Sequence, residues 1–160
     1  MEVVPCEDWK EFAWFMRAAY SQGGPRAFGN SGASEKVLDE LTSEKTAKYL
    51  LSKQKVLLAK QAGMTFGMAA WRRLDGERVE IAGVLVLDSA KRKGIGSALM
   101  ERALKDMAAA GFKAAIVKTE TTNEQALGFY QKFGFEVAGE LDEDLESGTV
   151  RCVLLGKQLA

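Results

Sequence analysis

A short turn rich in lysine, arginine and glycine, at residues 91–97, separates an apolar segment from a helical pattern. Apolar residues then recur with the four-residue spacing of one helix face until Gly111, which predicts a helix over residues 94–110. A short apolar strand pattern follows at residues 114–118. A strand, a helix and a strand in this order form a crossover whose two strands lie parallel. The sheet must therefore contain at least one parallel pair.

The remaining segments predict antiparallel neighbours around this crossover. Asp75-Gly76 is a strong hairpin signal, and an acidic turn at residues 142–148 joins the last two strands. Helical patterns cover residues 8–20 and 34–53, the second with a break near Ser43, and a glycine-rich loop at 21–34 lies between them. We expect one mixed α/β (α+β) domain over residues 1–160, with a mostly antiparallel sheet flanked by about four helices. The expected strands are residues 3–6, 55–61, 64–74, 78–87, 114–118, 135–141 and 149–155.

The charge count and the lack of histidine exclude several kinds of protein. The chain has 160 residues, with 22 basic and 22 acidic side chains and no histidine. Ser-His-Asp triads, Cys–His pairs and His-ligated metal sites are therefore excluded. Any acid or base must be a carboxylate, tyrosine, lysine, cysteine or water. The balanced charge argues against non-specific nucleic-acid binding, which needs a basic excess.

The cysteines and the N-terminal residues indicate a reducing compartment. Cys6 and Cys152 are the only two cysteines, so a four-cysteine zinc site is excluded, and we expect neither a metal site nor a disulfide. No apolar run approaches the ~20 residues of a membrane span. The segment Met1-Glu2-Val3 begins no signal-peptide pattern. We therefore expect a cytoplasmic protein with neither a membrane nor a nucleic-acid partner.

The turn at residues 91–97 predicts an anion site. Three consecutive cations precede the helix start, and Gly94 and Gly96 let backbone N–H groups approach a ligand. The unpaired N–H groups and the helix dipole favour negative charge there. The P-loop lysine spacing is missing, and Leu99 replaces the third glycine of a dinucleotide fingerprint. The alternative is a solvated basic helix start with a glycine turn.

A second motif lies downstream and reads Asn123-x-x-Ala126-x-x-Phe129-Tyr130-Gln131-Lys132-Phe133-Gly134-Phe135. With the basic turn it makes residues 80–139 resemble the GNAT superfamily of acyl-CoA-dependent N-acetyltransferases. The motifs of that family read Arg/Gln-x-x-Gly-x-Gly/Ala and Asn-x-x-Ala-x-x-Phe-Tyr-x-Lys-x-Gly-Phe. Lys91 departs from the family pattern but keeps a cation at the first loop position. The resemblance implies a sheet that splays apart between strands four and five, leaving a slot for a pantetheine arm.

The resemblance also implies which residues bind acetyl-CoA as the acyl donor. Backbone N–H groups of residues 92–97 would bind the pyrophosphate, and the main chain of Val84 and Val86 would bind the pantetheine amides as an added strand does. Phe129 also fits a core position. The implied cofactor-binding residues are Val84, Leu85, Val86, Lys91, Arg92, Lys93, Gly94, Ile95, Gly96, Ser97, Asn123, Ala126, Phe129 and Tyr130.

Two residues of the second motif have both a structural and a functional interpretation. The resemblance implies that Tyr130 is catalytic and protonates the departing thiolate or orients the thioester sulfur. Its alternative is a core tyrosine, because it shares a helix face with Ala126 and Phe133. Asn123 is expected to cap a helix over residues 124–133 that Gly134 closes, to contact the pantetheine arm, or to do both.

Glu80 is the candidate general base. A lysine-type amine has a pKa near 10.4 and must lose a proton before it attacks, and a carboxylate can take that proton directly or through water. Glu80 lies eleven residues before Lys91, a spacing that resembles the base position of histone-type family members. A β-bulge near Gly83 would alter the direction in which it faces. The alternatives are a solvent-exposed strand glutamate at this position, and Glu120 or water as the base.

These residues predict an N-acetyltransferase that moves an acetyl group from acetyl-CoA to a primary amine of a small molecule or protein by direct attack. The alternative is a non-catalytic acyl-CoA-binding sensor or interaction module on the same fold. The acidic turn at residues 142–146 would either draw cationic acceptors or be a solvated tip. The acceptor amine, the acyl group and the oligomeric state are left open, although homodimers are common in the family.

Overall fold

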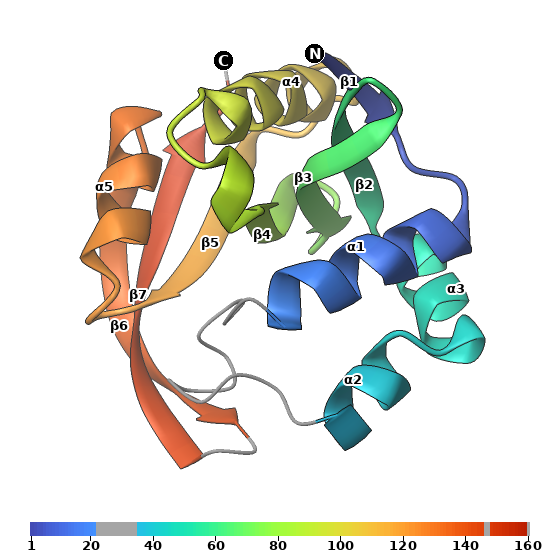
Figure 1. The fold of residues 1–160 in the computed structure, drawn as a ribbon. Helices are drawn as coiled ribbons and strands as arrows, with labels where there is room; N and C mark the ends of the chain where they lie inside the picture. Colours follow the sequence, from blue (N-terminus) through green and yellow to red (C-terminus); the bar gives the residue numbers. More distant parts are fainter. Residues whose placement is uncertain (22–34, 146–147, 160) are drawn as a thin grey trace.

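A computed structural model of the chain describes residues 1–21, 35–145 and 148–159. Seven strands form one sheet in the order β1-β2-β3-β4-β5-β7-β6 (Figure 1). All neighbouring strands pair antiparallel except β4 and β5, which are parallel. The mixed, mostly antiparallel fold expected from the sequence is therefore confirmed. The strands are β1 (Glu2–Pro5), β2 (Lys55–Gln61), β3 (Met64–Arg73), β4 (Arg78–Val86), β5 (Ala114–Glu120), β6 (Glu136–Leu145) and β7 (Gly148–Gln158).

The described residues form five α-helices where about four were expected. The difference arises because the second helical stretch divides at Ser43, whose side chain accepts a hydrogen bond of 3.3 Å from the backbone N–H of Thr46 and starts a new helix. The predicted break near Ser43 is confirmed. The helices are α1 (Trp9–Ser21), α2 (Glu35–Leu41), α3 (Glu44–Lys53), α4 (Ile95–Ala109) and α5 (Glu124–Lys132), with a short 3-10 turn η2 (Asp88–Ala90).

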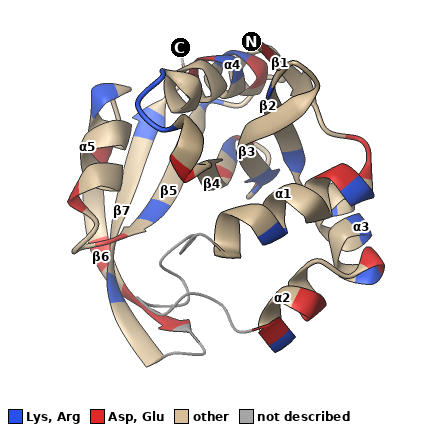
Figure 2. Cartoon of the chain, in the orientation of Figure 1, with Lys and Arg blue, Asp and Glu red and all other residues tan. Residues whose placement is uncertain are grey.

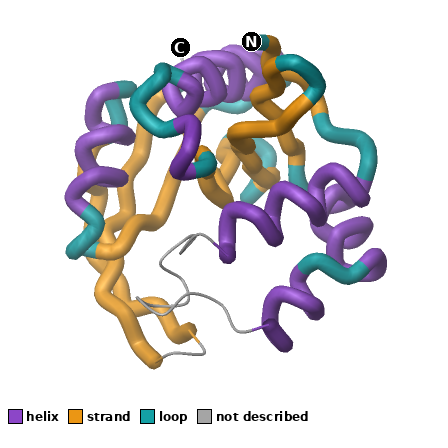
Figure 3. The backbone as a smooth tube through the Cα atoms, viewed as in Figure 1, coloured by secondary structure: helices purple, strands orange, loops and turns teal. Residues whose placement is uncertain are grey.

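Helices cover both faces of the sheet (Figures 1 and 3). On one face, α4 and α5 bury Leu99, Met100 and Tyr130 against side chains of the central strands. On the other face, α1 and α3 bury Phe12 and Phe15 against β2 and β3. The burial of these large apolar side chains supplies most of the free energy that holds the helices on the sheet.

The expected acidic turn at residues 142–148 is wrong, because β6 continues to Leu145 and pairs with β7 there. Cross-strand contacts offset the poor strand preference of aspartate. Arg151 donates to Asp142 at 3.1 Å, and the hydroxyl of Thr149 donates to Asp144 at 2.9 Å. Glu146 and most of the expected loop at residues 21–34 lie outside the described residues.

The two parallel strands in the middle of the sheet separate soon after they meet. Residues 78–81 of β4 pair with residues 114–117 of β5. Beyond that point β4 pairs with β3, whereas β5 pairs with β7. The predicted splay between strands four and five is therefore confirmed, and it leaves an opening in the sheet.

Neither thiol of the chain is in a disulfide, since Cys6 and Cys152 are both free. Burial raises the pKa of the Cys6 thiol to about 11. Within the described ranges, none of the helices combines the length and the apolar character needed to cross a membrane.

Candidate active site

The opening between β4 and β5 exposes part of a central strand. Val84, Leu85 and Val86 are only partly buried, although β4 lies in the middle of the seven strands. Leu87 donates its backbone N–H to Phe66 of β3 at 2.9 Å. Backbone groups of successive strand residues point to opposite sides, so those of Val84 and Val86 point away from β3 and into the opening. This orientation supports their predicted role in binding an extended ligand.

A β-bulge lies beside Gly83 on β4. Gly83 pairs with Ala70 and Ile81 pairs with Trp71, so Ala82 is an extra residue on β4. The bulge reverses the alternation of side chains, because Ile81 and Val84 pack on the same face although they are three residues apart. Glu80 keeps the opposite face from Ile81 and lies at the narrow end of the opening.

The basic turn before α4 has the backbone shape of an anion site. Arg92 and Gly94 have positive φ angles of 65° and 78°. Gly94 occupies the N-cap position without any side-chain cap, so the first N–H groups of α4 have no side-chain acceptor there. Such a cradle of N–H groups with alternating backbone conformations binds anions. Figure 2 shows the basic loop immediately before α4.

The three cations of this turn are exposed, but they differ in their partners. Lys91 forms an ion pair of 2.9 Å with Asp88, three residues earlier. This pair brings the Lys91 side chain beside η2, while Arg92 and Lys93 have exposed side chains beside the helix start. Lys91 and Arg92 both belong to the implied cofactor-binding residues, and both side chains are exposed beside the helix start.

Gly96 is the point at which the two sequence motifs meet. A Cβ atom at Gly96 would lie 3.3 Å from the ring of Phe129 and 3.7 Å from a methyl of Val86. The basic turn, the helix of the second motif and the opened strand are therefore in contact at one place. Phe129 is partly buried and packs edge-on against Tyr130, with ring centroids 5.4 Å apart. Its predicted contact with the cofactor remains a prediction, and its core contacts are observed.

Tyr130 lies in the core with its ring between Phe129 and Phe135 and is 6% exposed. Burial raises the pKa of its hydroxyl to about 12. The phenol is therefore protonated throughout the neutral range. No hydrogen bond joins this hydroxyl to the part of the chain that the structure describes. A protonated hydroxyl without a hydrogen bond to these residues can donate one to a ligand.

Asn123 caps α5, which confirms the expected capping role. Its side-chain oxygen accepts a hydrogen bond of 3.1 Å from the backbone N–H of Ala126. The side-chain NH₂ group remains for a ligand, so the cap and the predicted contact with a pantetheine arm are compatible.

Replacing Asn123 with alanine should lower the free energy of unfolding by about 1 kcal/mol, because α5 loses its N-cap. Asn123→Ser, which can still cap, should keep most of that stability. Denaturant unfolding of both variants measures this cost, and CoA titration shows whether the amide also contacts the ligand. An alanine variant with unchanged stability would contradict the capping role.

Glu80 is 8% exposed, so the interpretation of an exposed strand glutamate is wrong. Arg72 on β3 donates to its Oε1 through Nε at 2.9 Å and through a terminal nitrogen at 2.5 Å. Lys118 on β5 lies 3.7 Å from Oε2. Glu120, the second candidate base, is partly buried at the end of β5. Sequence reasoning missed Arg72 and Lys118, because neither belongs to a motif.

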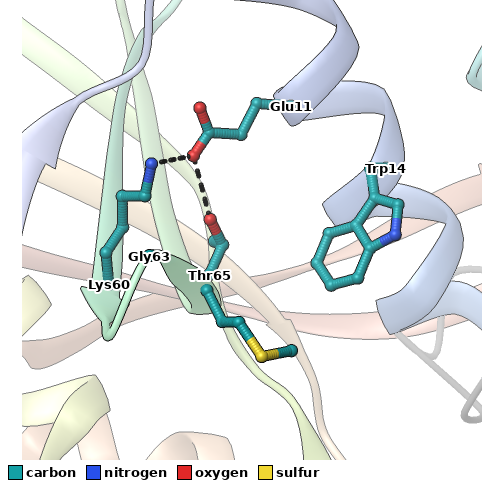
Figure 4. A pocket seen from close by; sticks show the side chains of 6 residues that line it. Glu11, Trp14, Lys60, Gly63 and Thr65 are labelled. Carbon is teal, nitrogen blue, oxygen red and sulfur yellow. Dashed lines mark hydrogen bonds and ion pairs between the residues drawn. The ribbon is translucent and has the colours of Figure 1, made fainter.

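A separate hollow lies between α1 and the β2–β3 turn (Figure 4). Glu11 accepts there from Lys60 at 2.5 Å and from Thr65 at 3.1 Å, beside the exposed indole of Trp14. The hollow shares no residue with the predicted site. Among the described residues there is no cluster of three or more side chains of the metal-binding types.

The structure thus brings an opened parallel strand pair beside a glycine turn and a helix start without a side-chain cap. Comparison with known proteins identifies the family: the model of the acetyltransferase (GNAT) family matches residues 12–135. The chain belongs to this family.

Individual relatives are more distant. An L-methionine sulfoximine/L-methionine sulfone acetyltransferase of Pseudomonas aeruginosa is 28% identical over 86 residues, which are 51% of this chain and 50% of the relative. The match thus spans about half the length of the curated relative. Two solved structures share the fold. The structure of yncA of Salmonella typhimurium with acetyl-CoA has a TM-score of 0.74 and 17% sequence identity, and the match covers 100% of this chain and 94% of that one. The ribosomal-protein-S18-alanine N-acetyltransferase of Escherichia coli has a TM-score of 0.72 and 15% sequence identity, with 99% of this chain and 94% of that one covered.

Proposed function

We propose that this chain is an N-acetyltransferase that transfers an acetyl group from acetyl-CoA to a primary amine by direct attack. The single observation that carries the proposal is the contact at Gly96, where the basic turn, α5 and the opened strand meet. An anion cradle, an extended backbone and a buried phenol around one opening support this reaction. The fold match to a structure that holds acetyl-CoA supports acetyl-CoA as the donor.

Each part of the site has a defined task in this reaction. The N–H groups at the start of α4 bind the pyrophosphate, and the backbone of Val84 and Val86 holds the pantetheine arm as an added strand would. A backbone N–H near Val86 stabilises the oxyanion that forms when the amine attacks the thioester carbonyl. Tyr130 donates its proton to the departing thiolate.

Glu80 takes the proton of the acceptor amine, directly or through one water. Its Oε1 is occupied by Arg72, whereas Oε2 has the longer contact of 3.7 Å with Lys118. Oε2 is therefore the oxygen that accepts the proton. The carboxylates of the last hairpin are less suited to steering cations, because Asp142 pairs with Arg151 and Asp144 accepts from Thr149.

The acceptor is proposed to be a small molecule, since the curated relative acts on one. Thiol release from acetyl-CoA over a panel of amino acids, polyamines, aminoglycosides and peptide amines tests this. Faster release with one class, over the rate without acceptor, is the expected result. CoA-induced thermal stabilisation without turnover on any amine would instead favour the non-catalytic binding module on the same fold.

A further inference from the structure

Four side chains of alternating charge cross the narrow end of the opening. Arg72 on β3 binds Glu80 on β4, Glu80 lies 3.7 Å from Lys118 on β5, and Lys118 lies 3.2 Å from Glu143 on β6. These side chains come from four strands, and none of them belongs to either of the two sequence motifs. Each carboxylate faces a cation, so the group carries no net charge.

The Glu80–Lys118 pair lies where the two parallel strands separate. Ile81 and Val117 form the last backbone pair between β4 and β5, and Lys118 is the next residue along β5. Val117 and Ile81 pack on the face covered by α4, so Lys118 and Glu80 share the opposite face. Their side chains are therefore the last contact between the strands before the opening.

We propose that Lys118 is a positioning residue for Glu80: shared between Glu80 and Glu143, its ammonium group holds Oε2 of Glu80 at the narrow end of the opening. The proposal rests on the proposed function in that Glu80 is the base. Lys118 faces two carboxylates and divides its attraction between them.

The charged groups around Glu80 and Lys118 determine in which direction a substitution moves the titration midpoint of Glu80. Burial, then the nearby carboxylates, raise the pKa of the Cys152 thiol on β7, so it remains neutral. An opposite charge within ~4–6 Å of a carboxylate lowers its pKa by about one unit or more. The titratable or charged groups in contact with this pair, or grouped with Lys118 around Cys152, are Arg72 on β3, Glu120 on β5, Asp142 and Glu143 on β6, and Cys152 on β7.

Substitutions of Lys118 and of Glu143 should therefore move the titration midpoint of Glu80 in opposite directions. Lys118→Met removes a cation from Glu80 and should raise the titration midpoint of Glu80 by about one pH unit at low salt. Glu143→Gln leaves Lys118 with Glu80 alone and should lower that midpoint. Lys118→Arg keeps the cation and should restore a value near that of the unchanged protein.

The matched control is Glu140→Gln. Glu140 lies on the same strand as Glu143 and undergoes the same chemical change, but it pairs with Arg151 at 3.3 Å, whereas the ion pairs of Lys118 within the described residues are with Glu80 and Glu143. Glu140→Gln should leave the titration midpoint of Glu80 unchanged. A general loss of hairpin stability or of net charge would act equally in Glu140→Gln and Glu143→Gln.

Carbon-13 NMR of protein labelled at the glutamate carboxyl carbons measures the midpoint between about pH 3 and pH 8, around the ordinary glutamate pKa. The signal lost in Glu80→Gln assigns Glu80. Opposite shifts in Lys118→Met and Glu143→Gln, with none in Glu140→Gln, support the proposal. An unchanged midpoint in Lys118→Met, or shifts in the same direction in both variants, overturns it.

The pH profile of kcat/KM separates this proposal from the proposed function. The pH at which kcat/KM falls on the acidic side of the profile should move together with the NMR titration midpoint of Glu80 in each variant. If the midpoint of Glu80 shifts as expected while the acid limb stays fixed, the coupling to Lys118 holds and the role of Glu80 as the base is wrong. The NMR titration needs no turnover, so it decides the coupling even for an acceptor that has not been identified.

Discussion

Replacing Tyr130 with phenylalanine is expected to lower kcat about 100-fold and to leave the affinity for CoA nearly unchanged. General acid catalysis contributes about 10²- to 10⁴-fold, and the thiolate that departs from acetyl-CoA needs a proton donor. The pKa of Tyr130, raised to about 12 by burial, keeps the hydroxyl protonated at neutral pH. Phenylalanine keeps the ring between Phe129 and Phe135 and removes only the donor.

Steady-state kinetics and CoA titration measure the two quantities separately. Tyr49→Phe is the matched control, because it removes a hydroxyl from an exposed side chain of α3, away from the site. It should leave both quantities unchanged. An unaltered kcat in Tyr130→Phe would mean that Tyr130 is only a core residue, while a large loss of CoA affinity would mean that the hydroxyl serves binding.

Local features of this site were predictable from the sequence because short segments determine them. The glycine at position 94 adopts a left-handed conformation that few other residues tolerate, so its presence before a helical pattern indicated the turn. Asn123 lies one residue before a helical pattern and caps it, as its residue type favours. The splay of the sheet was implied only by the resemblance of these motifs to a family.

Features that depend on distant pairings were not predictable. The carboxylates after Leu141 indicated a turn, yet partners across the hairpin keep them in a strand. Lys118 and Glu143 are separated by 25 residues, and no local pattern connects them. Glu80 was expected from its spacing to Lys91, but its burial and its contact with Arg72 depend on the register of β3 and β4. Contacts between strands are set by the whole sheet rather than by any single segment.

Replacing Glu80 with glutamine should lower kcat/KM at neutral pH about 100-fold and remove the acid limb of its pH profile. Glutamine has nearly the shape of glutamate and can still accept from Arg72, but it cannot take a proton from the acceptor. Arg72 is half exposed in this pair, and ion pairs screened by water contribute little. The free energy of unfolding should therefore fall by only about 1 kcal/mol.

Arg72→Gln separates the chemical role of Glu80 from the structural role of its ion pair. This variant breaks the same pair but keeps the carboxylate, so it should lose comparable stability. Its acid limb should move to higher pH, because removal of a cation raises the pKa of a carboxylate, and its rate above that limb should remain well above the rate of Glu80→Gln. Equal losses of rate in both variants would show that the pair only holds β3 against β4. In that case Glu120→Gln, measured in the same way, tests the second carboxylate at the opening.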